Sequence, residues 1–429
     1  MNTMKSLIPN EPKQEMQGKP IPEKEFKQFS IDKHRVYTHV KDLDFLRGQQ
    51  PNMVIAECKR KCKFMQNRFK TQKLKPKNKY VMSLSVYRQL HWSEHYGGKI
   101  LKPANVKFHK MYKPYTGQPL DGKRLLVWRT GGIGDLLFIQ PNLIYLKEKY
   151  PDCEILFSCG PQYQAMVETW DCIDQIVDLP FNFLQMVKSD YHCTFEGVIE
   201  RCELAKTENA YRLFTQWMGL NLPDDKLKPK QDPKPEWVVK SKETLRTWGL
   251  DNKPFILAQL RASSPIRTPR PSVWGNIIDN LAGKGYKIVI TDIKRFESGI
   301  DKFISEYIKP ENKHNVFNYA THSETLDSTI ALASHSSLVL SIDSALVHIA
   351  ASLNKKSLTL YGPFPSNTRI DTYGDNAKAI ECNKVKCAPC YIHGHMPCPN
   401  AFEEHGICFD NIDYDEVFDK VDMMMKDFI

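Results

Sequence analysis

The feature that most constrains the fold is a polar turn between two apolar runs near the C-terminus. Residues 343–351, Asp-Ser-Ala-Leu-Val-His-Ile-Ala-Ala, lie between the apolar runs 338–342 and 357–361. A buried strand that turns directly into a helix leaves free backbone N–H groups at the positive end of the helix dipole. Such a turn can hold a phosphate or diphosphate. The pattern predicts an α/β domain with a diphosphate-binding turn formed by Asp343, Ser344, Ala345 and Leu346.

A second strand-to-helix edge lies far upstream. Residues 124–128 have a buried-strand pattern, residues 130–134 are Thr-Gly-Gly-Ile-Gly, and a helix pattern begins at Asp135. Glycines allow the backbone angles that a tight strand-to-helix loop needs. We therefore expect two Rossmann-like, doubly wound domains that face a cleft. In the alternative interpretation each aspartate is only a helix N-cap, which stabilises a helix by about 1 kcal/mol.

The glycine loop differs from the common nucleotide-binding signatures. Gly131, Gly132 and Gly134 lack the G-x-G-x-x-G spacing, and no G-x-x-x-x-G-K-[ST] sequence occurs in the chain. A Rossmann dehydrogenase and a P-loop enzyme are both disfavoured.

Further landmarks follow in a fixed order. They are Gly132-Ile133-Gly134-Asp135 with Pro141, Arg270-Pro271 with Trp274, Asp343-Ser344-Ala345 with His348, and Tyr361-Gly362-Pro363. In this order and spacing, residues 124–425 resemble the heptosyltransferase family, glycosyltransferase family 9. The resemblance implies a GT-B fold, with the nucleotide-sugar donor on the C-terminal domain and the acceptor on the N-terminal one. It also implies inverting sugar transfer with no catalytic metal or other catalytic cofactor, and Asp135 as the general base.

The chemistry of the proposed base fits its residue type. An acceptor hydroxyl has a very high pKa, so a carboxylate must take its proton as the new bond forms. A helix N-terminus should keep Asp135 ionised. Gly132 and Gly134 of the same loop are expected to lie against the nucleotide-sugar.

The diphosphate leaving group needs cations and N–H donors. A basic, hydroxyl-rich loop follows the strand pattern of residues 255–260, and guanidinium groups suit bidentate phosphate contacts. Its expected donor-binding residues are Arg261, Ser263, Ser264, Arg267 and Arg270. The alternative is a solvated basic loop.

Two features near this site depart from the family or stay open. Family members commonly carry a lysine in the basic loop and a glycine at the position of Ala345, which is tolerable only if its φ is negative. His348, in the first turns of the predicted helix, either faces the donor or packs structurally.

Four cysteines near the C-terminus have the spacing C-x2-C-x7-C-x9-C: Cys387, Cys390, Cys398 and Cys408. Four thiolates can close a tetrahedral zinc or iron site of structural type. A similar cluster recurs in heptosyltransferase-like sequences, and in some of them it binds iron. Two disulfides or reduced buried thiols are the alternatives.

Composition bears on location. Twelve cysteines without a signal-peptide pattern favour a reducing, cytoplasmic compartment. No apolar run reaches the ~18 residues of a membrane-spanning helix, so we expect at most peripheral contact at the inner membrane face.

The length of 429 residues accommodates two α/β domains and additional segments. The predicted divisions are a flexible tail (1–30), a basic N-terminal extension (31–120), an acceptor domain (121–222), a proline-rich linker (223–235), a nucleotide-sugar domain (236–412) that contains the cysteine cluster (382–408), and a C-terminal helix (413–429) able to pack back on the N-terminal domain.

Positive charge is concentrated in the extension. Residues 59–124 carry a formal charge of +16, against +1 for residues 1–58 and −7 for residues 125–429. Between Lys59 and Lys79 there are ten basic residues and no acid. We expect this segment to contact a polyanion. A solvated helix, with the interspersed aromatic residues buried, is the alternative.

Several functions remain open at this stage. In the first, the acceptor is a lipopolysaccharide-type glycan and the extension contacts anionic lipid. In the second, the acceptor is a hydroxyl on a nucleic-acid base, as in a DNA glycosyltransferase. A catalytically inactive GT-B scaffold that binds nucleic acid, and a nucleotide-sugar epimerase, complete the alternatives.

Overall fold

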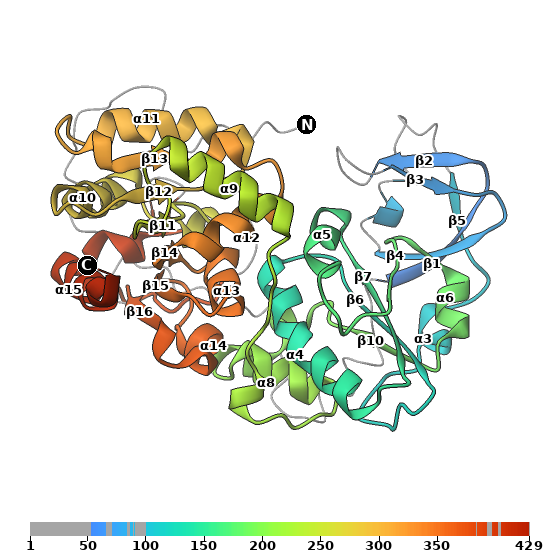
Figure 1. The fold of residues 1–429 in the computed structure, drawn as a ribbon. Helices are drawn as coiled ribbons and strands as arrows, with labels where there is room; N and C mark the ends of the chain where they lie inside the picture. Colours follow the sequence, from blue (N-terminus) through green and yellow to red (C-terminus); the bar gives the residue numbers. More distant parts are fainter. Residues whose placement is uncertain are drawn as a thin grey trace. The chain divides into compact units, whose positions relative to one another are not determined.

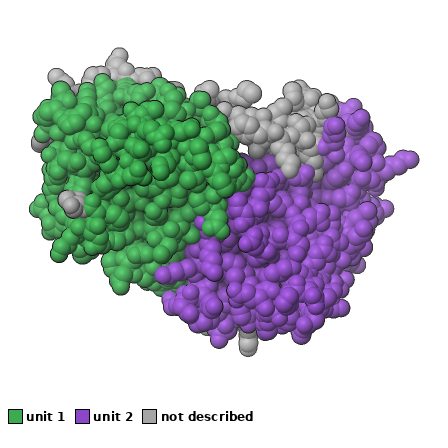
Figure 2. All heavy atoms as spheres, viewed as in Figure 1, with its two compact units in different colours: residues 1–34, 232–429 green, residues 35–231 purple. Residues whose placement is uncertain are grey.

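The computed structural model describes residues 53–65, 71–83, 86–88, 90, 100–382, 384–392, 397–401 and 405–428. The described chain divides into two compact units, one within residues 35–231 and the other within residues 232–429 (Figure 2). The predicted tail and the first part of the predicted extension lie outside the described residues.

The unit of residues 35–231 contains a parallel sheet with the described strand order β10-β6-β7-β8 (Figure 1). The strands are β6 (Arg124–Arg129), β7 (Glu154–Cys159), β8 (Gln175–Ile176) and β10 (Tyr191–Thr194). The apolar run in β6 is buried, and the chain then passes through the glycine loop into α4 (Ile133–Lys149). Helices α5 (Gln164–Val167), α7 (Val198–Arg201) and α8 (Ala210–Trp217) follow, and α8 packs on α4.

An antiparallel sheet precedes this parallel sheet in the chain. Its described strand order is β5-β1-β4-β9, from β1 (Met53–Cys58), β4 (Lys79–Ser83), β5 (Leu101–Pro103) and β9 (Phe181–Asn182). A hairpin, β2 (Cys62–Met65) and β3 (Thr71–Leu74), carries the basic run. The alternative of a solvated helix is therefore wrong for these residues. The same alternative also expected the aromatic residues of the extension to be buried. This part is correct for Tyr80, Phe108 and Tyr115.

The extension shares a hydrophobic core with the parallel sheet. Ile55 and Val81 from the antiparallel strands pack with Leu126 and Trp128 of β6, and Phe181 of β9 joins the same cluster. Helices α3 (Phe108–Met111) and α6 (Phe183–Lys188) flank it. The described part of the extension is thus built into its unit and is not a separate arm.

The unit of residues 232–429 has, among its described residues, a six-stranded parallel sheet of order β13-β12-β11-β14-β15-β16 (Figure 1). The strands are β11 (Ile256–Ala258), β12 (Ile288–Ile290), β13 (Val316–Asn318), β14 (Leu338–Ile342), β15 (Lys356–Tyr361) and β16 (Ala377–Glu381). The strand order reverses between β11 and β14. Ligands of open parallel sheets bind beside the carboxyl ends of the strands at such a reversal.

Helices cover this sheet: α9 (Pro235–Thr247), α10 (Pro271–Gly283), α11 (Glu297–Tyr307), α12 (Leu326–His335), α13 (Ala345–Ser352), α14 (Asn367–Ile370) and α15 (Tyr414–Met425). The C-terminal helix α15 packs on α10, β15 and β16, and Met424 and Met425 enter the core of its own unit. The expectation that α15 also packs back on the N-terminal domain stays a prediction. Within the described residues, no helix is long and apolar enough to cross a membrane.

Candidate functional site

The turn at Asp343 lies where β14 ends and α13 begins, on one side of the strand-order reversal. Ser344 caps the helix, because its Oγ accepts a hydrogen bond from the N–H of Leu346 at 3.4 Å. The same Oγ donates to Oε1 of Gln259, which follows β11, at 2.7 Å. Ala345 is not among the non-glycine residues with positive φ, so the expected condition for an alanine here is met. The local structure predicted for this turn is present.

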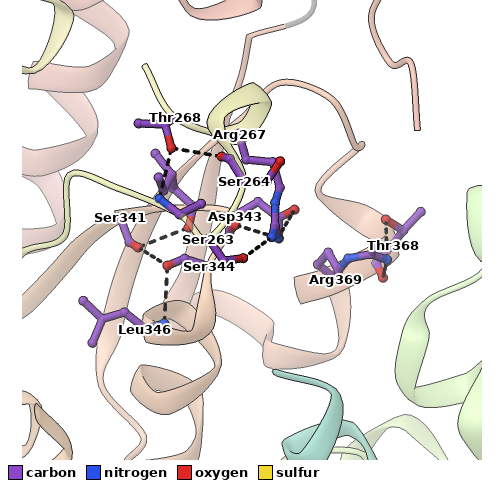
Figure 3. Close-up of polar contacts among 12 residues, drawn as sticks. Ser263, Ser264, Arg267, Thr268, Ser341, Asp343, Ser344, Leu346, Thr368 and Arg369 are labelled. Atoms are coloured by element: carbon purple, nitrogen blue, oxygen red, sulfur yellow. Dashed lines mark hydrogen bonds and ion pairs between the residues drawn. The ribbon is translucent and has the colours of Figure 1, made fainter. Parts of the chain in front are cut away.

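Arg267 joins the basic loop to this turn (Figure 3). Its Nη1 lies 3.1 Å from the carbonyl oxygen and 3.5 Å from Oδ2 of Asp343, and its Nη2 donates to Oγ of Ser263 at 2.9 Å. Asp343 is buried. Burial alone would raise the pKa of Asp343, but the charges of Arg267 and Arg369 hold that pKa below its ordinary value. Asp343 is therefore an anion that orients Arg267.

The basic loop is shaped by a small hydrogen-bonded turn. The hydroxyl of Thr268 donates to the carbonyl of Ser264 at 3.1 Å and accepts the N–H of Ala262 at 3.1 Å. The Ser264 hydroxyl is buried and has no hydrogen-bond partner among the described residues. A buried hydroxyl of this kind normally finds a partner, which makes Ser264 a candidate ligand contact.

The three guanidinium groups of the loop point to different carboxylates. Nε of Arg261 lies 2.7 Å from Oδ2 of Asp292, and its guanidinium stacks on the ring of Phe296. Nη2 of Arg270 lies 2.8 Å from Oδ2 of Asp410. Of these three arginines, therefore, only Arg267 lies at the Asp343 turn. Phosphate contacts by Arg261 and Arg270 stay predictions.

Arg369 is a residue that the sequence analysis missed. Arg369 lies in α14, and its side chain is buried, with 6% of the residue exposed. Its Nη1 donates to the carbonyl oxygen of Thr368 at 3.0 Å and to the hydroxyl oxygen of Thr368 at 3.2 Å. Its guanidinium also lies 5.0 Å from the ring of Phe364. A buried cation whose charge acts on Asp343 is suited to an anionic ligand. The sequence could not predict the position of Arg369, because α14 has only four residues and follows an irregular loop, so no helical or strand periodicity marks it.

His348 packs behind the turn. Its Nδ1 lies 2.6 Å from the hydroxyl of Tyr373, and the side chain is 3% exposed. Burial lowers the pKa of His348 to about 3, although Asp343 acts in the opposite direction. The imidazole is therefore neutral at physiological pH. This geometry favours the structural one of the two roles left open for His348.

The glycine loop of the other unit holds Asp135 in the first turn of α4. Its Oδ2 lies 3.0 Å from Nη2 of Arg129, and the same Nη2 lies 2.6 Å from Oε1 of Glu200. Arg129 also donates to the carbonyl of Phe195 at 2.7 Å. Burial would lower the pKa of Arg129, but Asp135 and Glu200 raise it well above its ordinary value. The sequence analysis missed Arg129 because it assigned residues 124–128 to a buried strand and did not consider the strand's last residue.

Gly132 is required by the position of that carboxylate. Its φ is +84°, and a Cβ added there would lie 2.0 Å from Oδ2 of Asp135. Only glycine combines this backbone angle with so close an approach. Gly134 lies inside the first turn of α4, where it keeps its predicted role as a proposal.

The four predicted metal ligands gather in one region. Cys387, Cys390 and Cys398 pack in one small cluster, and Cys408 lies in the neighbouring core. Burial raises the pKa of Cys390 to about 11 and raises the pKa of Cys408 well above its ordinary value, with the other cysteines adding to both shifts. All four are free thiols. In the part of the chain that the structure describes, however, no group of three or more His, Cys, Asp or Glu residues is arranged to hold a metal ion.

The landmarks described above coincide with a known family. Residues 198–398 match the profile of Glycosyltransferase family 9 (heptosyltransferase). This segment, just under half of the chain, is similar to that family. The expected resemblance to heptosyltransferases and the expected enzyme class, a glycosyltransferase, are therefore confirmed. No curated protein matches the sequence.

Solved structures of glycosyltransferases share the fold. The family 9 glycosyl transferase of Veillonella parvula is 16% identical, with a TM-score of 0.55, over 72% of this chain and 99% of its own. E. coli ADP-heptose lps heptosyltransferase II is 13% identical, with a TM-score of 0.54, over 71% and 99%. The iron-containing dodecameric glycosyltransferase TibC of enterotoxigenic E. coli is 11% identical, with a TM-score of 0.50, over 85% and 89%. At these identities the likeness concerns the fold alone, and it confirms the predicted α/β class with GT-B architecture.

Proposed function

We propose that this protein transfers a sugar, with inversion and without a catalytic metal, from a nucleotide-diphosphate sugar to a hydroxyl of a lipopolysaccharide-type glycan. The observation that carries the proposal is the meeting of Arg267 with the Asp343 turn at the carboxyl ends of β11 and β14. The likeness in fold to ADP-heptose lps heptosyltransferase II supports both the type of donor and the type of acceptor.

The Asp343 turn would stabilise the leaving group. As the bond from the sugar carbon to the diphosphate oxygen breaks, negative charge develops on that oxygen. The N-terminus of α13, the Arg267 guanidinium and the buried Arg369 cation are suited to receive it. Asp343, which is itself anionic, serves to hold Arg267 and not to contact the phosphates.

Asp135 is the proposed base. Its carboxylate would accept the proton of the acceptor hydroxyl while the oxygen attacks the sugar carbon from the face opposite the diphosphate. The ion pair with Arg129 fixes the direction of the carboxylate, since Arg129 is held in turn by Glu200 and a backbone carbonyl. A fixed general base contributes typically ~10² to 10⁴ in rate.

The cysteine cluster carries a separate proposal of a structural metal. Four thiols form a donor set typical of zinc or iron, and the TibC relative is iron-containing. In the described residues the four thiols do not form a coordination group, and a metal with four cysteine ligands would have no open position for a substrate. Metal analysis of the purified protein tests the proposal. One equivalent of zinc or iron, lost on Cys387→Ser and Cys398→Ser, is the expected result.

Nucleoside-diphosphate release tests the function. The purified chain is incubated with ADP-, UDP-, GDP- and CDP-sugars, with lipid A-core glycan or duplex DNA as the acceptor. We expect release that requires one donor and the glycan, and that falls at least a hundredfold in Asp135→Asn, because a base in the transition state is lost. Asp225→Asn changes an exposed carboxyl of the same unit and is the matched control.

The other outcomes discriminate the alternatives. Release that requires the DNA would identify a DNA glycosyltransferase instead. Conversion of the donor sugar without any acceptor would indicate an epimerase. No release from any pairing by folded protein would contradict the enzyme proposal and favour a binding scaffold.

A further inference from the structure

Asp292 and Phe296 hold the side chain of Arg261 in one fixed position. Nε of Arg261 lies 2.7 Å from Oδ2 of Asp292, and Nη2 lies 3.4 Å from Oδ1 of the same carboxylate. The guanidinium carbon lies 3.3 Å from the centroid of the Phe296 ring. At so short a distance the guanidinium lies flat on the ring, as arginines do when they stack on aromatic faces. The three side chains therefore form a rigid planar surface.

This surface lies beside the Asp343 turn on the carboxyl edge of one sheet. Arg261 follows β11, Asp292 follows β12, and Phe296 ends the short 3-10 turn that begins at Lys294. In the sheet, β11 lies between β12 and β14, and the Asp343 turn follows β14 (Figure 1). Since neighbouring strands lie ~4.8 Å apart, the end of β12 lies roughly 10 Å along this edge from the end of β14.

The charge of Arg261 already has a close counter-ion. Asp292 accepts hydrogen bonds from two nitrogens of Arg261, the shorter at 2.7 Å, and its Oδ1 also accepts the N–H of Ile293 at 2.7 Å. Nη1 of Arg267, in contrast, lies 3.5 Å from Oδ2 of Asp343. A cation with a close counter-ion gains less from a second anion. Of the two arginines, Arg267 is therefore better suited to a phosphate.

The part of Arg261 that remains open is the second face of its guanidinium, together with Nη1. Phe296 covers the first face, and Asp292 covers the edge formed by Nε and Nη2. Nη1 has no hydrogen-bond partner within the residues that the structure describes, and the side chain is 24% exposed. Nucleic-acid bases stack on guanidinium planes of this kind. The open face of Arg261 is thus suited to a flat heteroaromatic ring.

We propose that Arg261, held by Asp292 and Phe296, is the platform on which the base of the donor nucleotide stacks. The inference rests on the proposed function, because it places the base of a donor whose diphosphate lies at the Asp343 turn. In a nucleoside diphosphate the ribose separates the base from the phosphates, and the distance between platform and turn leaves room for it. Arg261 thus contacts the base, in place of the phosphate contact that the basic loop suggested.

This division of contacts distinguishes two kinds of ligand. Inorganic pyrophosphate has the diphosphate but no base, so its binding should depend on Arg267 and not on Arg261. Binding of a nucleoside diphosphate should depend on both arginines. A merely structural role of Arg261 would lower the affinity for both ligands alike.

The variants keep charge or apolar character while they remove the platform. Arg261→Lys keeps the positive charge but has no plane, and Phe296→Leu keeps an apolar side chain but removes the ring beneath the guanidinium. Arg267→Lys is the variant expected to affect the phosphates. The matched control is Arg246→Lys, because Arg246 lies in the same unit, is 64% exposed and is 3.6 Å from its acid, Asp251.

The measurement is calorimetric titration of the full chain with ADP, UDP, GDP and CDP, and with inorganic pyrophosphate. For the nucleoside diphosphate that binds best, we expect Arg261→Lys and Phe296→Leu to weaken binding about tenfold. The same two variants should change the affinity for pyrophosphate by less than about twofold. Arg267→Lys should weaken the binding of both ligands, and Arg246→Lys of neither. Circular dichroism and thermal melting check that each variant is folded.

Two outcomes would overturn this inference alone. One is an equal loss of affinity for pyrophosphate and for the nucleoside diphosphate in Arg261→Lys, which would assign Arg261 to the phosphates. The other is an unchanged affinity for the nucleoside diphosphate in both Arg261→Lys and Phe296→Leu. A folded, unsubstituted chain that binds no nucleoside diphosphate would contradict the proposed function, and the platform with it.

Discussion

At the scale of single residues, Gly132 and Gly131 form a natural matched pair. Gly132→Ala places a Cβ 2.0 Å from Oδ2 of Asp135 at a φ of +84°, whereas a Cβ at Gly131 meets nothing within 4 Å. We expect Gly132→Ala to destabilise its unit by about 1 to 3 kcal/mol. Displacement of the proposed base should also lower kcat about a hundredfold. Steady-state kinetics and urea unfolding check this, and Gly131→Ala should leave kcat within about twofold of the unchanged protein.

Arg129 is the second residue-scale prediction. Arg129→Met leaves Asp135 and Glu200 without their shared buried cation. The carboxylates left behind are 21% and 41% exposed and can be partly solvated, so the expected cost is about 1 to 3 kcal/mol. Urea unfolding should show this loss, partly restored in Arg129→Lys. Arg246→Met removes a guanidinium that is 64% exposed and should change the free energy of unfolding by less than about 0.5 kcal/mol. Equal effects of Arg129→Met and Arg246→Met would contradict the buried-pair interpretation.

At the scale of elements, Ser344 is a cap with a second role. Ser344→Ala and Asn209→Ala each remove a side chain that accepts a hydrogen bond at the start of a helix, α13 and α8 respectively. Each should therefore cost about 1 kcal/mol of stability. Only Ser344→Ala should weaken binding of the nucleoside diphosphate product, by about fivefold or more, because its helix start lies at the proposed diphosphate site. Calorimetric titration measures the affinity, and an equal affinity in both variants would contradict the site.

The elements also show what sequence could predict. The Asp343 turn was predictable, since an apolar strand, a capping serine and a helix are consecutive in the chain. Arg129 and Arg369 were not, because their partners Glu200 and Asp343 come from distant segments that only the folded sheets bring near. The basic run was predicted by composition, but its strands β2 and β3 were not, since a lysine-rich segment carries little of the apolar alternation that marks a strand.

At the scale of the whole molecule, buried histidines couple stability to pH. His192 is fully buried, Nδ1 accepts the N–H of Lys113 at 2.8 Å, and burial lowers the pKa of His192 to about 4. Between pH 6.5 and 4 the unfolded chain therefore binds a proton that the folded chain does not. The contribution of the neutral His192 to the free energy of unfolding is fully present above pH 6.5 and falls by about 3 kcal/mol as the pH approaches 4.

Urea unfolding, monitored by the fluorescence of Trp128 beside His192, should show this decrease of the free energy of unfolding with falling pH. His192→Asn should be less stable at pH 7 but flatter with pH, and an unchanged slope would contradict the assignment.

The pairing of β4 with β9 has a consequence for synthesis. Tyr80 pairs with Asn182, and Val81 pairs with Phe181, so a strand made early in translation waits for a partner made about a hundred residues later. At a translation rate of about 5 to 20 residues per second, the wait lasts roughly 5 to 20 s. During that interval the edge of β4 that pairs with β9 lacks this partner, and an unpaired strand edge is a site at which chains can associate wrongly. The first sheet to be synthesised is therefore completed only after most of the neighbouring parallel sheet has been made.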